Sequence, residues 1–136
     1  MHFNPYLAFK GNCEEAFKFY AEVLGGEILA MLKHRDTPMK DKTPPGMEEF
    51  VMHARMNVDG KLLMGGDAPD NWYKKPEGFN VHVGVDTPEE AERIFTALSE
   101  GGTVSMPLQE TFWAHKFGTC VDRFGTPWMV NCEKPM

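Results

Sequence analysis

The 136-residue sequence has no apolar run that approaches the roughly 20 residues needed for a membrane-spanning helix. Its N-terminus lacks the basic stretch followed by an apolar stretch that marks a signal peptide, so we expect a cytoplasmic protein with no membrane contact. A basic stripe is also missing, because 14 Lys and Arg residues are scattered among 20 Asp and Glu residues, with a net charge of −6. Nucleic acid is therefore not an expected partner.

Cysteine is scarce: only Cys13, Cys120 and Cys132 are present, and no two of them form a C-x-x-C pair. An odd number without such a pair argues against a disulfide framework and suits a reducing compartment. We expect Cys120 and Cys132 to be small core thiols, because a nucleophile would need an adjacent base that the sequence does not show. Methionine is abundant by contrast, and its ten residues favour an irregular core or an adaptable pocket.

Two segments, residues 6–28 and 80–104, repeat one plan. Each reads as an alternating strand, a polar turn, an amphipathic helix and a glycine pair that leads into another strand. Each glycine pair can supply the left-handed residue that ends a helix. The repeat predicts helices over residues 12–25 and 87–100.

Both predicted helices begin with a recognisable signal. Asn12 and Thr87 are good N-cap residues, because their side-chain oxygens can accept free backbone N–H groups. Pro88 fits the first helical position.

Three strands are expected after each helix, and Asp59-Gly60 is a strong two-residue hairpin signal between two of them. The predicted strands cover residues 27–35, 48–58, 61–66, 103–109, 113–122 and 127–133.

We expect one α+β domain over residues 1–136, built from two strand–helix–strand–strand–strand (βαβββ) modules. Module 1 covers about residues 1–66 and module 2 about residues 79–136, with a Pro/Gly/Asp-rich linker over residues 67–78. Residues 36–47 are expected to form a long, mobile loop. One helix cannot cover both faces of a sheet, so the curved mixed sheet is predicted to leave a cleft for a ligand.

The stretches "YLAFKGNCEEAFKFYAEVLGGEI", "LLMGGDAP" and "FGTCVDRFGTPWMVN" resemble the PhnB-like branch of the vicinal oxygen chelate superfamily. That superfamily includes glyoxalase I, extradiol dioxygenases and bleomycin-resistance proteins, and the branch is often labelled a 3-demethylubiquinone methyltransferase domain. The resemblance covers nearly the whole chain. It implies the glyoxalase/bleomycin-resistance/dioxygenase fold and a homodimer.

Metal-dependent members of the superfamily place His or Glu at four inward-facing strand positions. By the resemblance, these positions fall near Asn4 to Tyr6, near Met64, at Asn80 and near Met129. A catalytic divalent metal in an oxygen/nitrogen site needs imidazole and carboxylate, and amide or thioether groups are poor substitutes. We therefore predict no bound metal and no other cofactor.

Strand alternation selects the candidate ligand-binding residues. Asn80 and His82 alternate with Val81 and Val83, so the polar pair is expected to line the cleft. For Trp113, ligand binding and simple packing both stay open. The predicted ligand-binding residues are Tyr6, His53, Asn80, His82, Trp113 and Asn131.

The same polar residues allow a second interpretation, in which His53, His82 and Glu133 form a substitute metal site. Hydrogen-bonded polar residues in a wet pocket are the preferred interpretation, because no tight ligand spacing such as H-x-x-x-H is present. In the last hairpin we expect Asp122 to serve turn chemistry and Trp128 to be core.

Three functions stay open from the sequence. The leading one is a metal-free small-molecule-binding protein whose ligand is unknown. The alternatives are a metal-dependent lyase, isomerase or dioxygenase with relocated ligands, and a structural dimer whose cleft is filled by its own methionines. The methyltransferase label gains no support from the residues, since "VLGGEI" leaves a helix and enters a strand, the reverse of a cofactor-binding turn.

Overall fold

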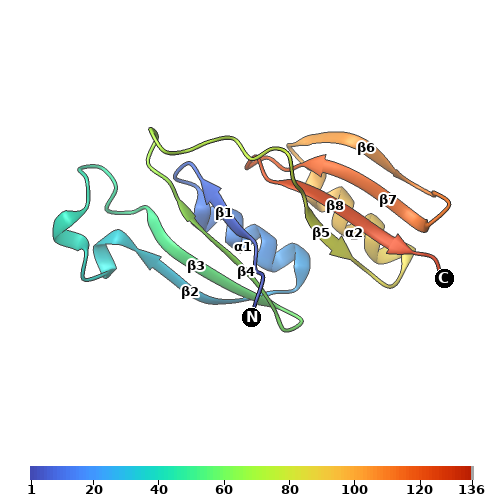
Figure 1. Cartoon of the computed structure of the whole chain (residues 1–136), viewed down its shortest axis with the longest axis horizontal. Helices are drawn as coiled ribbons and strands as arrows, with labels where there is room; N and C mark the ends of the chain where they lie inside the picture. Colours follow the sequence, from blue (N-terminus) through green and yellow to red (C-terminus); the bar gives the residue numbers. More distant parts are fainter. Residues whose placement is uncertain (136) are drawn as a thin grey trace. The chain divides into compact units, whose positions relative to one another are not determined.

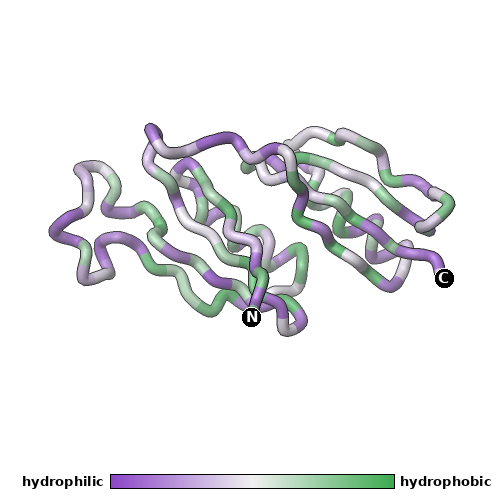
Figure 2. Tube along the Cα trace, viewed as in Figure 1, coloured by the Kyte–Doolittle hydropathy of each residue, from purple (hydrophilic) through white to green (hydrophobic). Residues whose placement is uncertain are grey.

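The computed structural model describes residues 1–135 of the chain. The chain divides into two compact units, unit 1 and unit 2, with the boundary between Lys74 and Lys75. This boundary falls inside the segment 67–78, where the polar composition predicts a linker. Figure 2 shows the connection between the last strand of unit 1 and the first strand of unit 2 as a predominantly hydrophilic stretch.

Unit 1 is a βαβββ module with one helix against one face of its sheet (Figure 1). The strand order is β1-β4-β3-β2, in which β1 runs parallel to β4 and the other neighbours are antiparallel. Its main elements are β1 (Tyr6–Phe9), α1 (Cys13–Leu24), β2 (Glu27–Lys33), β3 (Val51–Val58) and β4 (Lys61–Asp67).

The loop expected over residues 36–47 contains more local structure than the sequence indicates. Two short 3-10 helices, η1 (His34–Asp36) and η2 (Lys40–Lys42), lie between β2 and β3. The Thr43 hydroxyl donates to the Met39 carbonyl at 3.2 Å, which closes the second of these turns.

Unit 2 repeats the same module and the same strand order, β5-β8-β7-β6, again with the first strand parallel to its neighbour (Figure 1). The α+β class and the two βαβββ modules are thus confirmed. Its elements are β5 (Val81–Gly84), α2 (Pro88–Ser99), β6 (Thr103–Gln109), β7 (Ala114–Val121) and β8 (Pro127–Glu133).

Each helix packs closely on its own sheet because a glycine of the sheet, which has no side chain, lies beneath a phenylalanine of the helix. A Cβ added at Gly65 of β4 would lie 2.9 Å from the Phe17 ring of α1. In unit 2, a Cβ added at Gly118 of β7 would lie 2.9 Å from the Phe95 ring of α2. These contacts identify which face of each sheet meets its helix.

The helix ends follow the predicted chemistry at three of four positions. The Thr87 hydroxyl accepts the Glu90 backbone N–H at 3.2 Å, as an N-cap should. Gly25 and Gly101 take the left-handed conformation, with φ of 68° and 75°. Asn12 stands at the N-cap position of α1, but the capping hydrogen bond predicted for its side chain is wrong, because the side chain makes none.

The carboxylate of Asp67, and not the Asn12 side chain, accepts the free backbone N–H groups at the start of α1. Its Oδ1 accepts the backbone N–H groups of Gly11 and Cys13 at 2.9 and 3.0 Å. Its Oδ2 accepts the Val51 N–H at 2.8 Å. Asp67 ends β4, so one side chain ties the turn before α1 to the start of β3. The sequence pattern had assigned this residue to the linker.

Candidate functional site

Candidate binding residues gather on the face of each sheet that its helix does not cover, here called the helix-distal face. Side chains alternate between the two faces of a strand, so the residues next to Gly65 and Gly118 point away from the helices. In unit 1 the helix-distal face carries Tyr6, His53, Arg55 and Met64. In unit 2 it carries His82, Phe117, Thr119, Met129 and Asn131.

Tyr6 and His53, both predicted ligand-binding residues, are brought together in unit 1. Their rings stack with centroids 5.8 Å apart and an interplanar angle of 26°. The Tyr6 hydroxyl donates to the Met52 carbonyl at 3.4 Å and lies 3.5 Å from His53 Nδ1. A hydroxyl has one proton, so the His53 tautomer with a proton on Nδ1 completes this arrangement as the donor.

A recess makes room for the Tyr6 hydroxyl. A Cβ at Gly66 would lie 3.0 Å from Tyr6 Oη and 2.9 Å from the Met52 carbonyl oxygen, so only glycine leaves this space. Burial raises the pKa of the Tyr6 phenol above its ordinary value of 10.0, and ionisation of the Cys13 thiol at high pH would act in the same direction. The phenol is therefore a neutral hydrogen-bonding group at physiological pH.

His82 occupies the corresponding place in unit 2. The β1–β4 register pairs Tyr6 with Met64, and the β5–β8 register pairs His82 with Met129. A Cβ at Gly84 would lie 3.3 Å from Cε1 of His82, so the imidazole leans over this glycine. Each unit thus presents a polar ring beside a methionine at the same position of its sheet.

Asn131 lies on the same helix-distal face as His82 and is 5% exposed. Its Nδ2 donates to Glu133 Oε1 at 3.2 Å, while its Oδ1 has no hydrogen-bond partner within residues 1–135. Asn131 and Glu133 line a hollow of about 280 Å³ together with Gly84, Val85 and Asp86.

Trp113 and Asn80, the other two predicted ligand-binding residues of unit 2, lie in different surroundings. Trp113 is 37% exposed and packs edge-on against Phe117, with ring centroids 5.2 Å apart. Phe117 is the register partner of Asn131, which connects the indole to the same helix-distal face. Asn80 precedes β5, is exposed, and makes no hydrogen bond within the described part of the chain.

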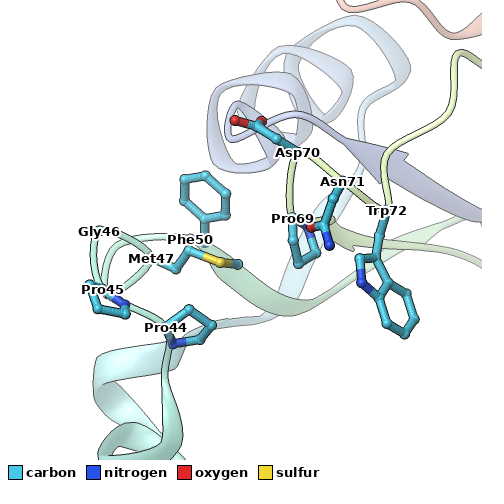
Figure 3. Close-up of a pocket in the computed structure, with 9 residues that line it drawn as sticks. All are labelled: Pro44, Pro45, Gly46, Met47, Phe50, Pro69, Asp70, Asn71 and Trp72. Carbon is cyan, nitrogen blue, oxygen red and sulfur yellow. The ribbon is translucent and has the colours of Figure 1, made fainter.

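A second hollow, of about 540 Å³, lies in unit 1 and was not predicted from the sequence. Figure 3 shows the loop residues Pro44, Pro45 and Met47 on one side and Pro69, Asn71 and Trp72 on the other. Apart from Phe50, which falls in the predicted strand 48–58, its residues come from two segments expected to be loop and linker, whose approach depends on the fold.

The residues at the strand centres do not fit the metal that the superfamily resemblance implies. Met64 has Tyr6 and Arg55 as register neighbours, and Met129 has His82 and Thr119. The one imidazole of His82, among thioether, phenol, guanidinium and hydroxyl groups, does not make the imidazole and carboxylate set of a catalytic divalent ion. Among residues 1–135, no three His, Cys, Asp or Glu side chains are grouped so that they could hold a metal ion.

The cysteines lie away from these surfaces. Cys13, Cys120 and Cys132 are buried free thiols, as expected for core residues. Burial raises the pKa of the Cys13 thiol far above its ordinary value of 9.0, and the charges of Asp67 and Glu14 add to the shift. The thiol is protonated at physiological pH and is a poor nucleophile.

Sequence reasoning missed three residues of the site in unit 2: Gly84, Asp86 and Phe117. Glu133, which the sequence analysis considered only for a metal site, follows Asn131 by strand alternation, and the same reasoning along β7 could have found Phe117. Alternation from His82 leads to Gly84 and Asp86, but their position beside Asn131 depends on β5 lying next to β8.

No helix within residues 1–135 has both the length and the apolar character needed to cross a membrane. A model of the family described as 3-demethylubiquinone-9 3-methyltransferase matches residues 1–131. Protein YjdN of Escherichia coli (strain K12) is 35% identical over 142 aligned positions, which cover 98% of this chain and 97% of that protein.

Solved structures agree with this match. Protein PA1353 from Pseudomonas aeruginosa is 46% identical, with a TM-score of 0.91 over 99% of each chain. A PhnB protein from Bacillus cereus is 28% identical, with a TM-score of 0.80 over 97% of this chain and 99% of that one. A glyoxylase/bleomycin resistance protein/dioxygenase domain from Frankia sp. EAN1pec, 10% identical with a TM-score of 0.64 over 98% and 95% of the two chains, shares the fold.

Proposed function

This chain belongs to the PhnB-like family described as 3-demethylubiquinone-9 3-methyltransferase, and we propose that it is a metal-free protein that binds a small molecule on its helix-distal faces. The observation that carries this proposal is the placement of polar and aromatic side chains there, with Tyr6 and His82 beside Met64 and Met129. Such a surface offers apolar contact area and a few hydrogen-bonding groups, which is the usual make-up of a ligand site.

The proposed ligand-binding residues are the six selected from the sequence. Tyr6 and His53 supply stacked rings in unit 1. In unit 2, His82, Trp113 and Asn131 supply an imidazole, an indole and a buried amide. Asn80 is the least supported, because it lies before β5 and contacts none of the others through a hydrogen bond among residues 1–135.

A fragment screen by NMR tests the proposal. Neutral, cationic and anionic aromatic fragments are titrated into the isotopically labelled chain, and saturable shifts of the His82 ring and the Trp113 indole are expected. His82→Ala should weaken the best fragment about tenfold, the effect of losing one good hydrogen bond in a desolvated site. His2→Ala is the matched control, since His2 is exposed and has no hydrogen bond within residues 1–135.

Elemental analysis separates this proposal from the metal-dependent alternative. Purified protein should contain far less than one Fe, Mn, Ni or Zn atom per chain, because methionines stand at the strand centres. One metal atom per chain, or a metal-dependent activity abolished by His82→Ala, would overturn the metal-free proposal.

We further propose a homodimer, because several large apolar side chains are exposed to solvent. Phe3, Trp72 and Phe112 are 91%, 75% and 89% exposed, and a second copy could cover such surface. Sedimentation at micromolar concentration should give twice the 15.4 kDa mass of the chain. A single 15.4 kDa species would contradict the dimer and leave the binding proposal intact.

A cytoplasmic location is also proposed, since three unpaired buried thiols suit a reducing compartment. Cell fractionation with antibodies against the native chain tests it. Recovery from a periplasmic or secreted fraction would contradict the proposal.

A further inference from the structure

The helix-distal face of unit 1 carries a positive charge at its centre, on Arg55. The strand that holds this residue, β3, is an inner strand of the sheet and lies between β2 and β4 (Figure 1). We infer that the small molecule carries an anionic oxygen group, a carboxylate or a phosphate, and that the Arg55 guanidinium binds it. The inference rests on the proposed binding function and adds the chemical class of the ligand.

The first support is that the guanidinium of Arg55 has no partner within residues 1–135. Of the four arginines in the sequence, two form ion pairs with glutamates, at 2.6 and 2.7 Å, and one lies over a phenylalanine ring. The fourth, Arg55, is exposed and makes no hydrogen bond, ion pair or ring contact in the described part of the chain. Its N–H donors are therefore free to form two parallel hydrogen bonds to a carboxylate or a phosphate.

The second support is the charge around this guanidinium. In register, Arg55 lies between Met64 of β4 and Ala30 of β2, and both neighbours are uncharged. The carboxylate of Glu27 is on the same face as the register partner of Asn57, but it forms no ion pair with Arg55. The chain has a net charge of −6, yet the positive charge here is not neutralised by a paired carboxylate. Its field therefore attracts an anion to this face.

The neighbouring side chains on the face provide for the rest of an anionic ligand. His53 precedes Arg55 by two residues, so the two lie on the same face with their Cα atoms about 7 Å apart, a span that a molecule of one ring can cover. Nδ1 of His53 lies 3.5 Å from the Tyr6 hydroxyl, while its Nε2 makes no hydrogen bond among residues 1–135. The stacked rings of Tyr6 and His53 and the thioether of Met64 offer apolar contact to the body of the ligand.

The equivalent face of unit 2 has no cation at this place. The β3–β4 and β7–β8 registers put Thr119 where unit 1 has Arg55, each beside the methionine at the strand centre. The same registers put Phe117 where unit 1 has His53. A hydroxyl and a phenyl ring do not attract an anion, so the anionic group is expected on unit 1 and not on unit 2.

The test is an NMR titration of the labelled full chain with sodium benzoate and with phenyl phosphate, at constant ionic strength. Saturable shifts are expected for the Nε–Hε signal of Arg55 and for the backbone amides of residues 53–57. Benzyl alcohol has no charge and benzylammonium has the opposite charge, so each should bind this face at least tenfold more weakly. The anion that binds more tightly identifies the group as a carboxylate or a phosphate.

Variants measure the contribution of the guanidinium. Arg55→Gln removes the charge and should weaken the tighter anion at least tenfold. Arg55→Lys keeps the charge but loses the paired N–H geometry, and it should weaken the same anion about threefold. Arg93→Gln, the matched control, removes the same charge from an exposed arginine of α2 and should leave the affinity unchanged. The replaced side chains are exposed, so the remaining amide signals should show an unchanged fold.

Equal affinity for benzoate and benzyl alcohol, or equal affinity of Arg55→Gln and the parent, would overturn the inference. Inorganic phosphate that binds as tightly as phenyl phosphate would overturn it too, because it would indicate an adventitious ion only. Fragments that shift the His82 and Trp113 signals while both anions leave the Arg55 signals unchanged would defeat this inference alone. Silence of both helix-distal faces toward every compound would defeat the proposed function as well.

Discussion

The indole Nε1 of Trp128 donates a 2.8 Å hydrogen bond to Oδ2 of Asp122, and both side chains are buried. The other carboxylate oxygen, Oδ1, accepts the backbone N–H groups of Phe124 and Thr126 at 2.9 and 3.0 Å. One carboxylate thus closes the β7–β8 turn and anchors the largest core side chain of unit 2. Turn chemistry, the role predicted for Asp122 from its place before Phe124-Gly125, is confirmed.

Removing this carboxylate should strongly destabilise the protein. Asp122→Ala leaves two backbone donors and the Trp128 indole without their acceptor, and we expect a loss of about 3–5 kcal/mol in the free energy of unfolding. Urea unfolding followed by tryptophan fluorescence measures it. A double-mutant cycle with Trp128→Phe should show a coupling of about 1–3 kcal/mol. Additive effects would mean that the hydrogen bond between these two residues contributes little.

Asp67 should be a local anchor of unit 1. Asp67→Asn replaces one acceptor oxygen by a donor, so at least one of the three backbone N–H groups loses its partner. The expected cost is about 1–3 kcal/mol, with faster hydrogen exchange at the Val51 amide. Asp41→Asn, a control on an exposed residue of η2, should stay within about 0.5 kcal/mol of the parent. Unchanged exchange at Val51 would contradict the anchoring role.

The buried thiol of Cys13 should make the protein less stable at high pH. Burial raises its pKa in the folded state above the ordinary value of 9.0, so the unfolded state loses this proton first. Stability is therefore fully present below about pH 9 and falls as the pH rises further, by up to about 1.4 kcal/mol per pH unit per thiol.

Urea unfolding between pH 8 and 10.5 measures this loss. Cys13→Ala should reduce the slope, and part of it should persist because burial also raises the pKa of Cys120. An identical slope in Cys13→Ala and the parent would contradict the assignment to Cys13.

Two glycines on the helix-distal faces should respond differently to alanine. At Gly84 the added methyl would lie 3.3 Å from the tip of the exposed His82 imidazole, which can turn aside, so Gly84→Ala should cost less than about 1 kcal/mol and shift the His82 Hε1 signal. At Gly66 it would lie 2.9 Å from the Met52 carbonyl oxygen, and Gly66→Ala should cost about 1–3 kcal/mol. Equal losses in the free energy of unfolding for Gly84→Ala and Gly66→Ala would contradict the expected difference between the two positions.

The sequence by itself determined the elements of the fold. The internal repeat was enough to place α1 and α2. Their ends depend on residues that act within one turn of the helix, such as Thr87 and Pro88 at the start of α2 and the left-handed Gly25 at the end of α1. Strand alternation was equally local, and it put His82 on the face opposite Val81 and Val83, which the structure shows to be the helix-distal face of unit 2.

Only the tertiary structure decided which polar groups meet. The Asp67 carboxylate accepts N–H groups from residues up to 56 positions away in the chain, so no local pattern could have transferred the capping role from Asn12 to it. The partnerless oxygen of Asn131 likewise became visible only when β5 and β8 lay side by side. Residue type and spacing determine which face a side chain is on, but its hydrogen-bond partners depend on segments that folding brings together.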